Sequence, residues 1–109
     1  MQFTVKEITD IVGGKLIQGN EQTKICYVEI DSRKVKANTL FVPFVGEKVD
    51  GHDYVEKAFE SGADAAFIER NLSVAKKDKA LILVKSSLIA LQKLAKAYRD
   101  KFSIEIIGI

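Results

Sequence analysis

The sequence predicts an α/β domain, a small layered fold in which helices cover a β-sheet. Segments with the apolar spacing of helices alternate with short apolar runs that are typical of buried strands. The chain has 109 residues, of which 47% are hydrophobic, and this is enough for one core. No internal repeat or low-complexity segment competes with this interpretation.

The first expected helix covers Val5 to Val12. Thr4 and Glu7 have the spacing of a capping box, in which each side chain satisfies a backbone N–H at the start of a helix. The pair Gly13-Gly14 supplies the left-handed backbone that commonly ends a helix. One face of this helix collects the apolar residues Ile8, Ile11 and Val12.

Two strands are expected next. Lys15–Gln18 precedes a Gly19-Asn20 turn, and Ile25–Ile30 alternates in the manner of a strand, with Cys26, Val28 and Ile30 on one side. A cysteine on such a strand is more often a core residue than a reactive one, so we expect Cys26 to pack rather than react.

The run Leu40–Val45 is apolar throughout and predicts a strand covered on both faces. Pro43 cannot donate to a ladder, which favours an edge strand or a bulge. A helix from about Asp53 to Ser61 follows, and Gly62 stands where a glycine commonly ends a helix.

Ala65–Ile68 and Ala80–Val84 predict two further buried strands. The polar residues between them, 69–79, are too few for a full crossover helix, so the relative direction of the two strands stays open.

The longest helix is expected from Ser86 or Ser87 to about Lys101, with a serine as its cap. A final strand, Ile104–Ile109, leaves the chain on an apolar end, from which we expect a fragment of a longer protein. We expect the helix to dock through an apolar stripe made of Leu88, Leu91, Ala95, Tyr98 and Phe102.

Composition argues against several classes of function. The net charge is +2, and the one tight basic cluster is Lys76, Lys77 and Lys79, interrupted by Asp78, so nucleic-acid binding is not expected. No apolar run approaches the ~20 residues of a membrane span. A single cysteine and the lack of a secretion signal favour the cytoplasm.

Polar and turn-forming residues concentrate in two segments. Asp31-Ser32-Arg33 directly follows a strand, and Gly46–His52 lies between a strand and a helix. In α/β sheets ligands favour such loops, and backbone N–H groups near a helix start suit anions. The alternative is that Asp31 and Ser32 form a local turn while Arg33 pairs with a neighbouring acid, and that His52 makes a structural hydrogen bond.

Catalytic machinery is not expected in this stretch. The sequence contains no G-x-x-x-x-G-K-[ST] phosphate loop, no Cys/His metal spacing, and no nucleophile and base of a familiar set. We therefore expect no catalytic residue, no metal ligand and no cofactor here.

The chain resembles the amino-terminal domain of Mur ligases, a small mixed β-sheet covered by helices. The resemblance covers nearly all of the chain. It extends through Leu88–Ala95, similar to the linker helix before the central ATPase domain, and Glu105–Ile109, similar to the strand that enters its phosphate loop. The motifs that carry it, in this order, are Asp31–Arg33, Leu40–Glu47, Asp50–Val55, Ala58 and Gly62-Ala63.

The resemblance implies a domain that holds the UDP portion of a UDP-MurNAc-peptide. Arg33 and Asp50 are expected to brace the loops as much as to touch the ligand, and Ser32 is the strongest single candidate. The positions that match the family's contacts or motifs are Ile30, Ser32 and Arg33 on the first loop and Gly46, Glu47, Lys48, Val49, Asp50 and His52 on the second.

The resemblance also implies an organisation: residues 1–84 as the UDP-binding domain, 85–103 as the linker helix, and 104–109 as the first strand of the ATPase domain. The whole enzyme would be a monomeric ATP-dependent amide ligase that uses ATP and Mg²⁺. The Pro43 strand, the Thr4–Gly14 opening and the Leu91–Arg99 linker favour the branch that adds D-alanyl-D-alanine. The alternatives are the branch that adds the third stem-peptide residue, and a stand-alone nucleotide-binding or interaction module.

Overall fold

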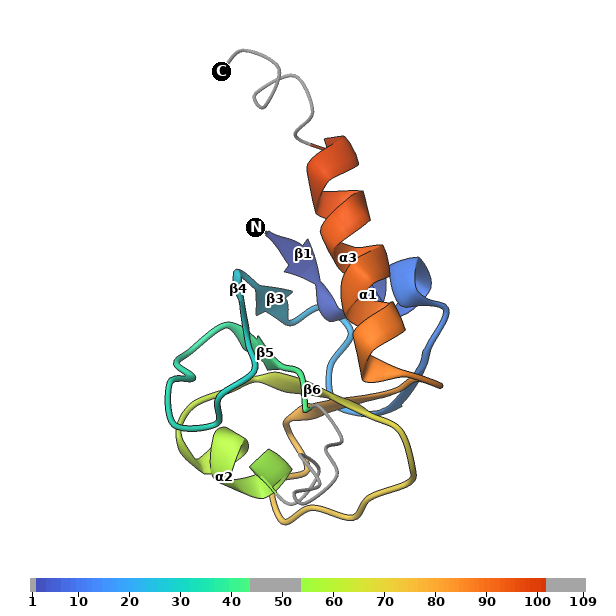
Figure 1. Ribbon diagram of the computed structural model, residues 1–109. Helices are drawn as coiled ribbons and strands as arrows, with labels where there is room; N and C mark the ends of the chain where they lie inside the picture. Colours follow the sequence, from blue (N-terminus) through green and yellow to red (C-terminus); the bar gives the residue numbers. More distant parts are fainter. Residues whose placement is uncertain (1, 44–53, 102–109) are drawn as a thin grey trace.

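The computed structural model describes residues 2–43 and 54–101 of the chain. Within these residues five strands form the main sheet in the order β2-β7-β6-β5-β4. Strands β1 and β3, labelled side by side in Figure 1, pair in a separate two-stranded sheet. The elements are, in chain order, β1 (Phe3–Thr4), α1 (Val5–Val12), β2 (Lys15–Gln18), β3 (Lys24–Ile25), β4 (Tyr27–Glu29), β5 (Thr39–Phe41), α2 (Val55–Glu60), β6 (Ala65–Ile68), β7 (Ala80–Leu83) and α3 (Ser87–Lys101).

The main sheet is mixed, as the resemblance implies. Strands β4, β5, β6 and β7 are parallel, and β2 pairs antiparallel with β7. The four parallel strands all end at one side of the sheet, which we call the carboxyl edge. They begin at the opposite side, which we call the amino edge. Ligands of open α/β sheets favour the carboxyl edge, which makes it the place to look for a site.

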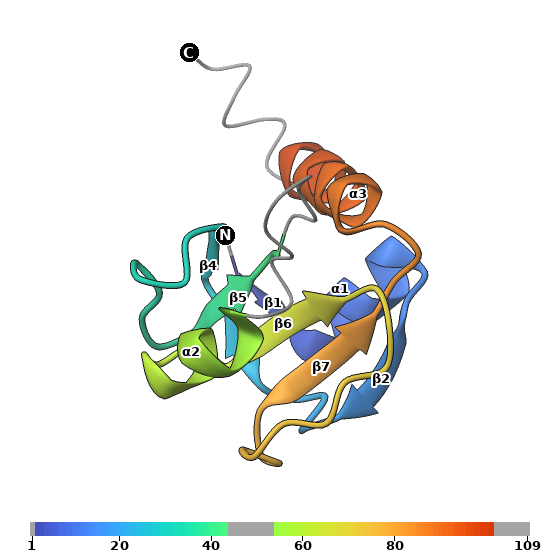
Figure 2. The same cartoon turned by 60° about the horizontal axis from the view of Figure 1, so that its bottom comes forward.

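Helices cover both faces of the main sheet (Figure 2). One core cluster joins α1 and α3 to the first face and includes Ile8, Phe67 and Leu94. A second cluster lies under α2 and includes Phe59. Neighbouring residues of a strand point to opposite faces, and both faces of the sheet are covered at β6. Ala65–Ile68 is therefore buried throughout, as predicted.

Helix α1 is confirmed with its expected bounds, because its signals are local. The Thr4 hydroxyl accepts from the Glu7 amide at 3.1 Å, and the Glu7 carboxylate accepts from the Thr4 amide at 2.9 Å. Gly13 ends the helix at φ 66°. Val5, Ile8 and Val12 are buried in the core.

The predicted single strand Ile25–Ile30 is wrong. The chain splits it into β3 and β4, which belong to different sheets. The amides of Cys26 and Tyr27 both donate to the Asn38 carbonyl, at 2.8 and 3.1 Å, and the alternation changes phase there. Ile25 is therefore buried whereas Tyr27 is 49% exposed, and Cys26 is half-buried and free.

Strand β5 is shorter than predicted and is not an edge strand. It lies between β4 and β6, and residues 39–43 are buried. The strand ends at Phe41, so Pro43 falls beyond the ladder that it cannot join. The last ladder contact uses the Val42 amide, which donates to the Glu29 carbonyl at 2.9 Å.

The short connection between β6 and β7 still joins parallel strands. Residues 69–79 cross one face without forming a helix, and Ala65 pairs with Ala80 in register. The preceding helix α2 lies inside the predicted range and is followed by Gly62 at φ 119°, as expected. Phe102 and the predicted strand Ile104–Ile109 lie outside the described residues.

Helix α3 has the predicted serine cap but docks through a different face. The Ser86 hydroxyl accepts from the Ile89 amide at 3.2 Å. The buried face is centred on Ala90 and Leu94, which pack in the cluster that contains α1. Of the predicted stripe, Leu91 is partly buried, but Leu88, Ala95 and Tyr98 are exposed. Two apolar faces overlap on this helix, and the pattern alone does not say which of them the core uses.

The amino edge is held together by Asp64. Its carboxylate accepts from the Asn38 amide at 2.6 Å and from the Lys79 ammonium at 3.1 Å. Its backbone N–H donates to the Thr39 carbonyl, and its carbonyl accepts from the Ala80 amide, both at 3.0 Å. One residue thus links the beginnings of β5, β6 and β7.

None of the helices in the described part of the chain has the length and apolarity to cross a membrane.

Candidate functional site at the carboxyl edge

The two candidate loops leave the sheet side by side. Strands β4 and β5 are parallel neighbours, and their last residues, Glu29 and Phe41, are paired. The loop that begins at Ile30 and the segment that begins at Val42 therefore start at adjacent points of the carboxyl edge. This is the arrangement that a shared ligand would need.

Three of the nine candidate site residues lie in the described part of the chain: Ile30, Ser32 and Arg33. The others lie outside it, so their approach to Ser32 stays a prediction. They are Gly46, Glu47, Lys48, Val49, Asp50 and His52.

Two carboxylates organise the first loop. The Glu29 side chain accepts from the amides of Ile30 and Asp31, at 2.9 and 3.1 Å. The Asp31 side chain accepts from the Arg33 amide at 2.9 Å, and its carbonyl accepts from the Lys34 amide at 3.0 Å. The alternative of a local turn at Asp31 is thus confirmed.

Arg33 braces this turn, as expected. Its Nε donates to Asp31 Oδ1 at 3.0 Å and its Nη2 donates to Asp31 Oδ2 at 2.9 Å, so the guanidinium grips the carboxylate with two bonds. The side-chain hydrogen bond from Arg33 is the main reason that the pKa of Asp31 falls to about 2, and the same bond raises the pKa of Arg33. The pair is charged at neutral pH, and the Arg33 side chain is 86% exposed.

Ile30 and Ser32 differ in what they offer to a ligand. Ile30 is 54% exposed and presents an apolar side chain beside the end of β4. Ser32 is 8% exposed, so little of its surface is available to a ligand. A ligand at this loop would meet the apolar side chain of Ile30, little of Ser32, and the exposed guanidinium of Arg33.

The amides of the first loop are poorly suited to phosphate. Those of Ile30, Asp31 and Arg33 already donate to carboxylates. A phosphate there would compete with those groups and would face their negative charges. The backbone of this loop is therefore better suited to the uncharged part of a nucleotide than to its phosphates.

Glu69 lies at the end of the neighbouring strand β6, also at the carboxyl edge. It follows β6, and its carboxylate accepts from the Ser87 amide at 2.6 Å, at the start of α3. An anion at this helix start would therefore meet a carboxylate already in place. Glu29 and Glu69 were not identified from the sequence. The available signal was an acidic residue at the last position of a strand, or directly after the strand, that precedes a turn or a serine cap.

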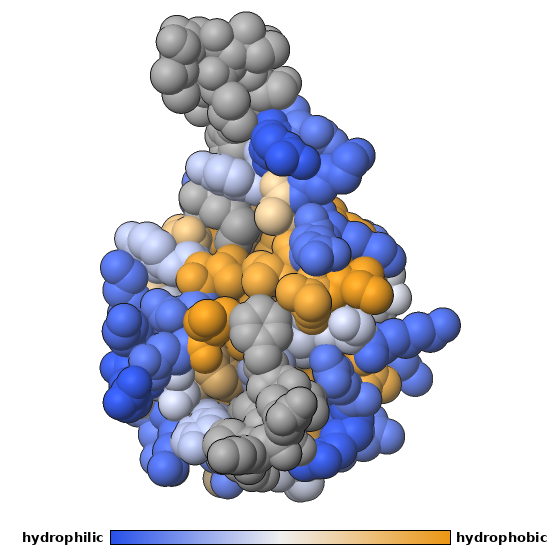
Figure 3. All heavy atoms as spheres, in the orientation of Figure 1, coloured by the Kyte–Doolittle hydropathy of each residue, from blue (hydrophilic) through white to orange (hydrophobic). Residues whose placement is uncertain are grey.

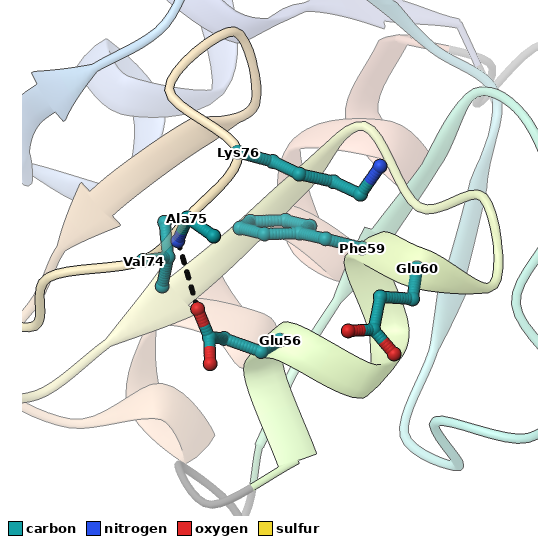
Figure 4. Close-up of a pocket in the computed structure, with 6 residues that line it drawn as sticks. All are labelled: Glu56, Phe59, Glu60, Val74, Ala75 and Lys76. Atoms are coloured by element: carbon teal, nitrogen blue, oxygen red, sulfur yellow. Dashed lines mark hydrogen bonds between the residues drawn. The ribbon is translucent and has the colours of Figure 1, made fainter.

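A shallow hollow, of about 220 Å³ when the open solvent at its mouth is included, lies between α2 and the 69–79 connection. In Figure 4 the stem of Lys76 extends over the ring of Phe59, and the Glu56 carboxylate accepts from the Ala75 amide at 2.8 Å. Ile30, Ser32 and Arg33, the candidate site residues in the described part of the chain, do not line it. Its lining residues are Glu56, Phe59, Glu60, Val74, Ala75 and Lys76.

The described residues contain no group of three or more His, Cys, Asp or Glu side chains that could hold a metal ion.

Comparison with known proteins places this fold in a family. Residues 24–99 match the family described as "Mur ligase family, catalytic domain". The chain is 43% identical, over 97% of its length, to the UDP-N-acetylmuramoyl-tripeptide--D-alanyl-D-alanine ligase of Bacillus subtilis, of which it covers 23%. It is 40% identical, over 78% of its length, to the UDP-N-acetylmuramoyl-L-alanyl-D-glutamate--2,6-diaminopimelate ligase of Bacillus velezensis, of which it covers 17%.

Solved structures agree on the fold. A crystal structure of MurF from Acinetobacter baumannii superposes with a TM-score of 0.81 at 24% identity, covering 93% of this chain and 22% of that one. MurF ligase from Thermotoga maritima in complex with ADP gives a TM-score of 0.54 at 31% identity, covering 71% of this chain and 17% of that one. The chain thus spans less than a quarter of the length of the relatives it matches.

Proposed function

The chain belongs to the Mur ligase family, and we propose that it is the substrate-binding amino-terminal domain of the ligase that adds D-alanyl-D-alanine to UDP-MurNAc-tripeptide. The observation that carries this proposal is the 43% identity to the Bacillus subtilis enzyme of that name over 97% of the chain. The fold shared with MurF supports it.

The binding site we propose is the carboxyl edge, at the loops that follow β4 and β5. Its support is the pairing of Glu29 with Phe41, which starts both loops at neighbouring points. Ile30 would contact the uridine, and Ser32 would donate or accept one hydrogen bond. The second loop would close the site through Gly46, Glu47, Lys48, Val49, Asp50 and His52.

Recognition is divided between the two loops in this proposal. The amides of Ile30, Asp31 and Arg33 are already bonded, so the first loop would hold the uridine. The diphosphate would then bind at the second loop, where Gly46 would permit close approach of the backbone.

The proposed organisation follows the same family pattern. Residues 1–84 would form the UDP-binding domain, 85–103 the linker helix, and 104–109 the first strand of the next domain. ATP and Mg²⁺ would bind outside this chain, because the sequence contains no phosphate loop. We expect the chain alone neither to hydrolyse ATP nor to form the amide.

This domain would contribute to catalysis by anchoring the substrate. It would hold the nucleotide far from the carboxylate that reacts, and binding energy from a remote group can be used to orient the reacting end. Weaker binding of the uridine would then lower turnover at low substrate concentration without changing any catalytic group.

A second candidate is the ligase that adds the third stem-peptide residue. The 40% identity to the Bacillus velezensis diaminopimelate ligase favours it, although over a smaller part of the chain.

Phosphate release from ATP by the full-length protein separates the two candidates. We expect release to require UDP-MurNAc-tripeptide and D-alanyl-D-alanine. Release that instead requires the dipeptide precursor and diaminopimelate would favour the second candidate. An absence of both activities would contradict the proposal.

The binding site itself is tested by ligand-observed NMR with UDP, which detects weak binding. Ser32→Ala should weaken binding roughly 3- to 10-fold, the effect of one lost hydrogen bond. Ser61→Ala, which removes an exposed serine near the amino edge, is the matched control and should leave binding unchanged. Equal binding by both variants would exclude a role for Ser32.

A further inference from the structure

Helix α3 carries a second apolar stripe next to the face that it buries. Leu88, Leu91 and Ala95 follow one another at steps of three and four residues, so they line up along the helix. Leu88 is 52% exposed, Leu91 is partly buried and Ala95 is exposed. We call these three residues the α3 stripe.

Apolar side chains gather on the face of the molecule that carries the amino-terminal half of α3. Figure 3 shows them in a band across the middle of the molecule, including the place where the amino-terminal half of α3 stands in Figure 1. Leu91 packs against the core cluster that contains α1, so the stripe is continuous with the interior. A partner that covered it would extend an existing core.

Ile89 shows that exposure alone does not make such a surface. It is 53% exposed, almost the same as Leu88. Its neighbours along the helix face at three and four residues, Lys85, Gln92 and Lys93, are all polar. Ile89 is therefore an isolated apolar residue, whereas Leu88 belongs to a row.

The charge of α3 argues against a second copy as the partner. The helix carries four basic residues and one acidic residue, Asp100. Two such helices packed together would bring like charges close, whereas a partner with acidic residues around an apolar centre would be attracted. The basic residues are Lys93, Lys96, Arg99 and Lys101.

The relatives indicate where such a partner comes from. The chain covers 23% of the Bacillus subtilis ligase and 22% of the Acinetobacter baumannii MurF chain. We propose that the α3 stripe is the docking surface for the polypeptide that follows residue 109 in the full-length ligase, through an apolar patch rimmed by acidic side chains. This rests on the proposed function in one respect, that the parent protein is a ligase of its relatives' length.

Cysteine labelling tests the proposal. In a Cys26→Ser background, Leu88→Cys and the matched control Ile89→Cys are placed in both the 109-residue chain and the full-length protein. In the full-length protein, Leu88→Cys should react with a maleimide at least about tenfold more slowly than in the short chain, because docking must open first. Ile89→Cys should react at a similar rate in both.

Hydrogen exchange of the unsubstituted proteins provides a second measurement, which does not depend on the variants. Side-chain docking should slow amide exchange across 88–95 in the full-length protein. Equal labelling of Leu88→Cys in the two proteins, a concentration-dependent dimer of the short chain, or a reading frame that ends at Ile109 would each overturn the proposal. Labelling needs no nucleotide, so a protected stripe in a protein without ligase activity would contradict the proposed function alone.

Discussion

The two edges of the main sheet are built in different ways. At the amino edge, Asp64 bonds to Asn38, 26 residues away, and to Lys79, 15 residues away. At the carboxyl edge, the side chains of Glu29 and Asp31 accept from amides one or two positions along the chain. Glu69, which reaches Ser87 at a separation of 18, is the exception there.

This difference separates stability from recognition. Contacts between distant segments hold the strands together, so a change at the amino edge should weaken the whole fold. Loops that are held by their own residues can change without disturbing the strands, and this is the property that a binding edge needs. The predictions below test that division.

The largest effect is expected at Gly19, which lies against the first residue of β7. A Cβ there would come within 2.5 Å of the Ala80 Cα, and the residue has φ +98°. Gly19→Ala should lower the free energy of unfolding by about 3 kcal/mol or more, from overpacking together with left-handed strain. Urea denaturation measures this.

The control for Gly19 is Gly13→Ala. Gly13 is also left-handed, at φ +66°, but nothing lies within 4 Å of its Cβ position. Gly13→Ala should lower the free energy of unfolding by about 1 kcal/mol, from backbone strain alone. Equal effects of the two substitutions would show that the close approach to Ala80 does not matter.

Asp64→Ala should have the next largest effect on stability. The side chains of Asp64 and Lys79 are 28% and 17% exposed, so removing the carboxylate leaves a poorly solvated ammonium and an unpaired Asn38 amide. We expect a loss of about 2–3 kcal/mol in unfolding free energy. Asp31→Ala, at the other edge, should leave the unfolding midpoint nearly unchanged; a larger effect of Asp31→Ala would reverse the comparison.

Glu69→Gln tests the exception at the carboxyl edge. The variant keeps the shape of the side chain but removes the charge that faces the start of α3. The unfolding free energy should fall by about 1 kcal/mol, which is typical of a carboxylate at a helix amino end. A loss as large as that of Asp64→Ala would mean that both edges carry the fold.

The smallest effect concerns the charge state of Asp31. Its pKa is lowered from the ordinary 3.8 to about 2, first by the side-chain hydrogen bond from Arg33. Because the folded pKa is the lower one, the pair's contribution is fully present above 3.8 and is lost as the pH falls toward 2. The Arg33 side chain is 86% exposed and water screens the pair from that side, so the unfolding midpoint should change little across this range.

Carbon-detected NMR of the Asp31 carboxyl measures that pKa directly. Arg33→Gln should move the midpoint up toward 3.8, and Arg70→Gln should leave it unchanged. A midpoint near 3.8 in the unsubstituted chain would contradict the pairing.

Local signals explain what the sequence predicts well. The capping box at Thr4 and Glu7 and the glycine at position 13 lie within the helix they delimit, and α1 has its expected bounds. The break between β3 and β4 depends on the carbonyl of Asn38, which lies 12 residues from Cys26 in sequence and adjacent in space. No local pattern carries that information.

The candidate site shows the same limit. Arg33 and Asp31 are two residues apart, and their pairing was foreseeable as an alternative. The role of Glu69 depends on α3 beginning beside the end of β6, which a linear pattern does not contain. The choice of face on α3 likewise depends on α1, not on α3 itself.

The most direct test of the proposed function is a titration of the isotope-labelled chain with UDP, followed through backbone amide shifts. We predict that the amides of Ile30 to Arg33 and of Gly46 to Val49 shift together with one affinity, while those of Asn38, Asp64 and Lys79 at the amino edge stay in place. Shifts centred on the amino edge, or on the hollow at Phe59, would contradict the assignment of nucleotide binding to the carboxyl edge.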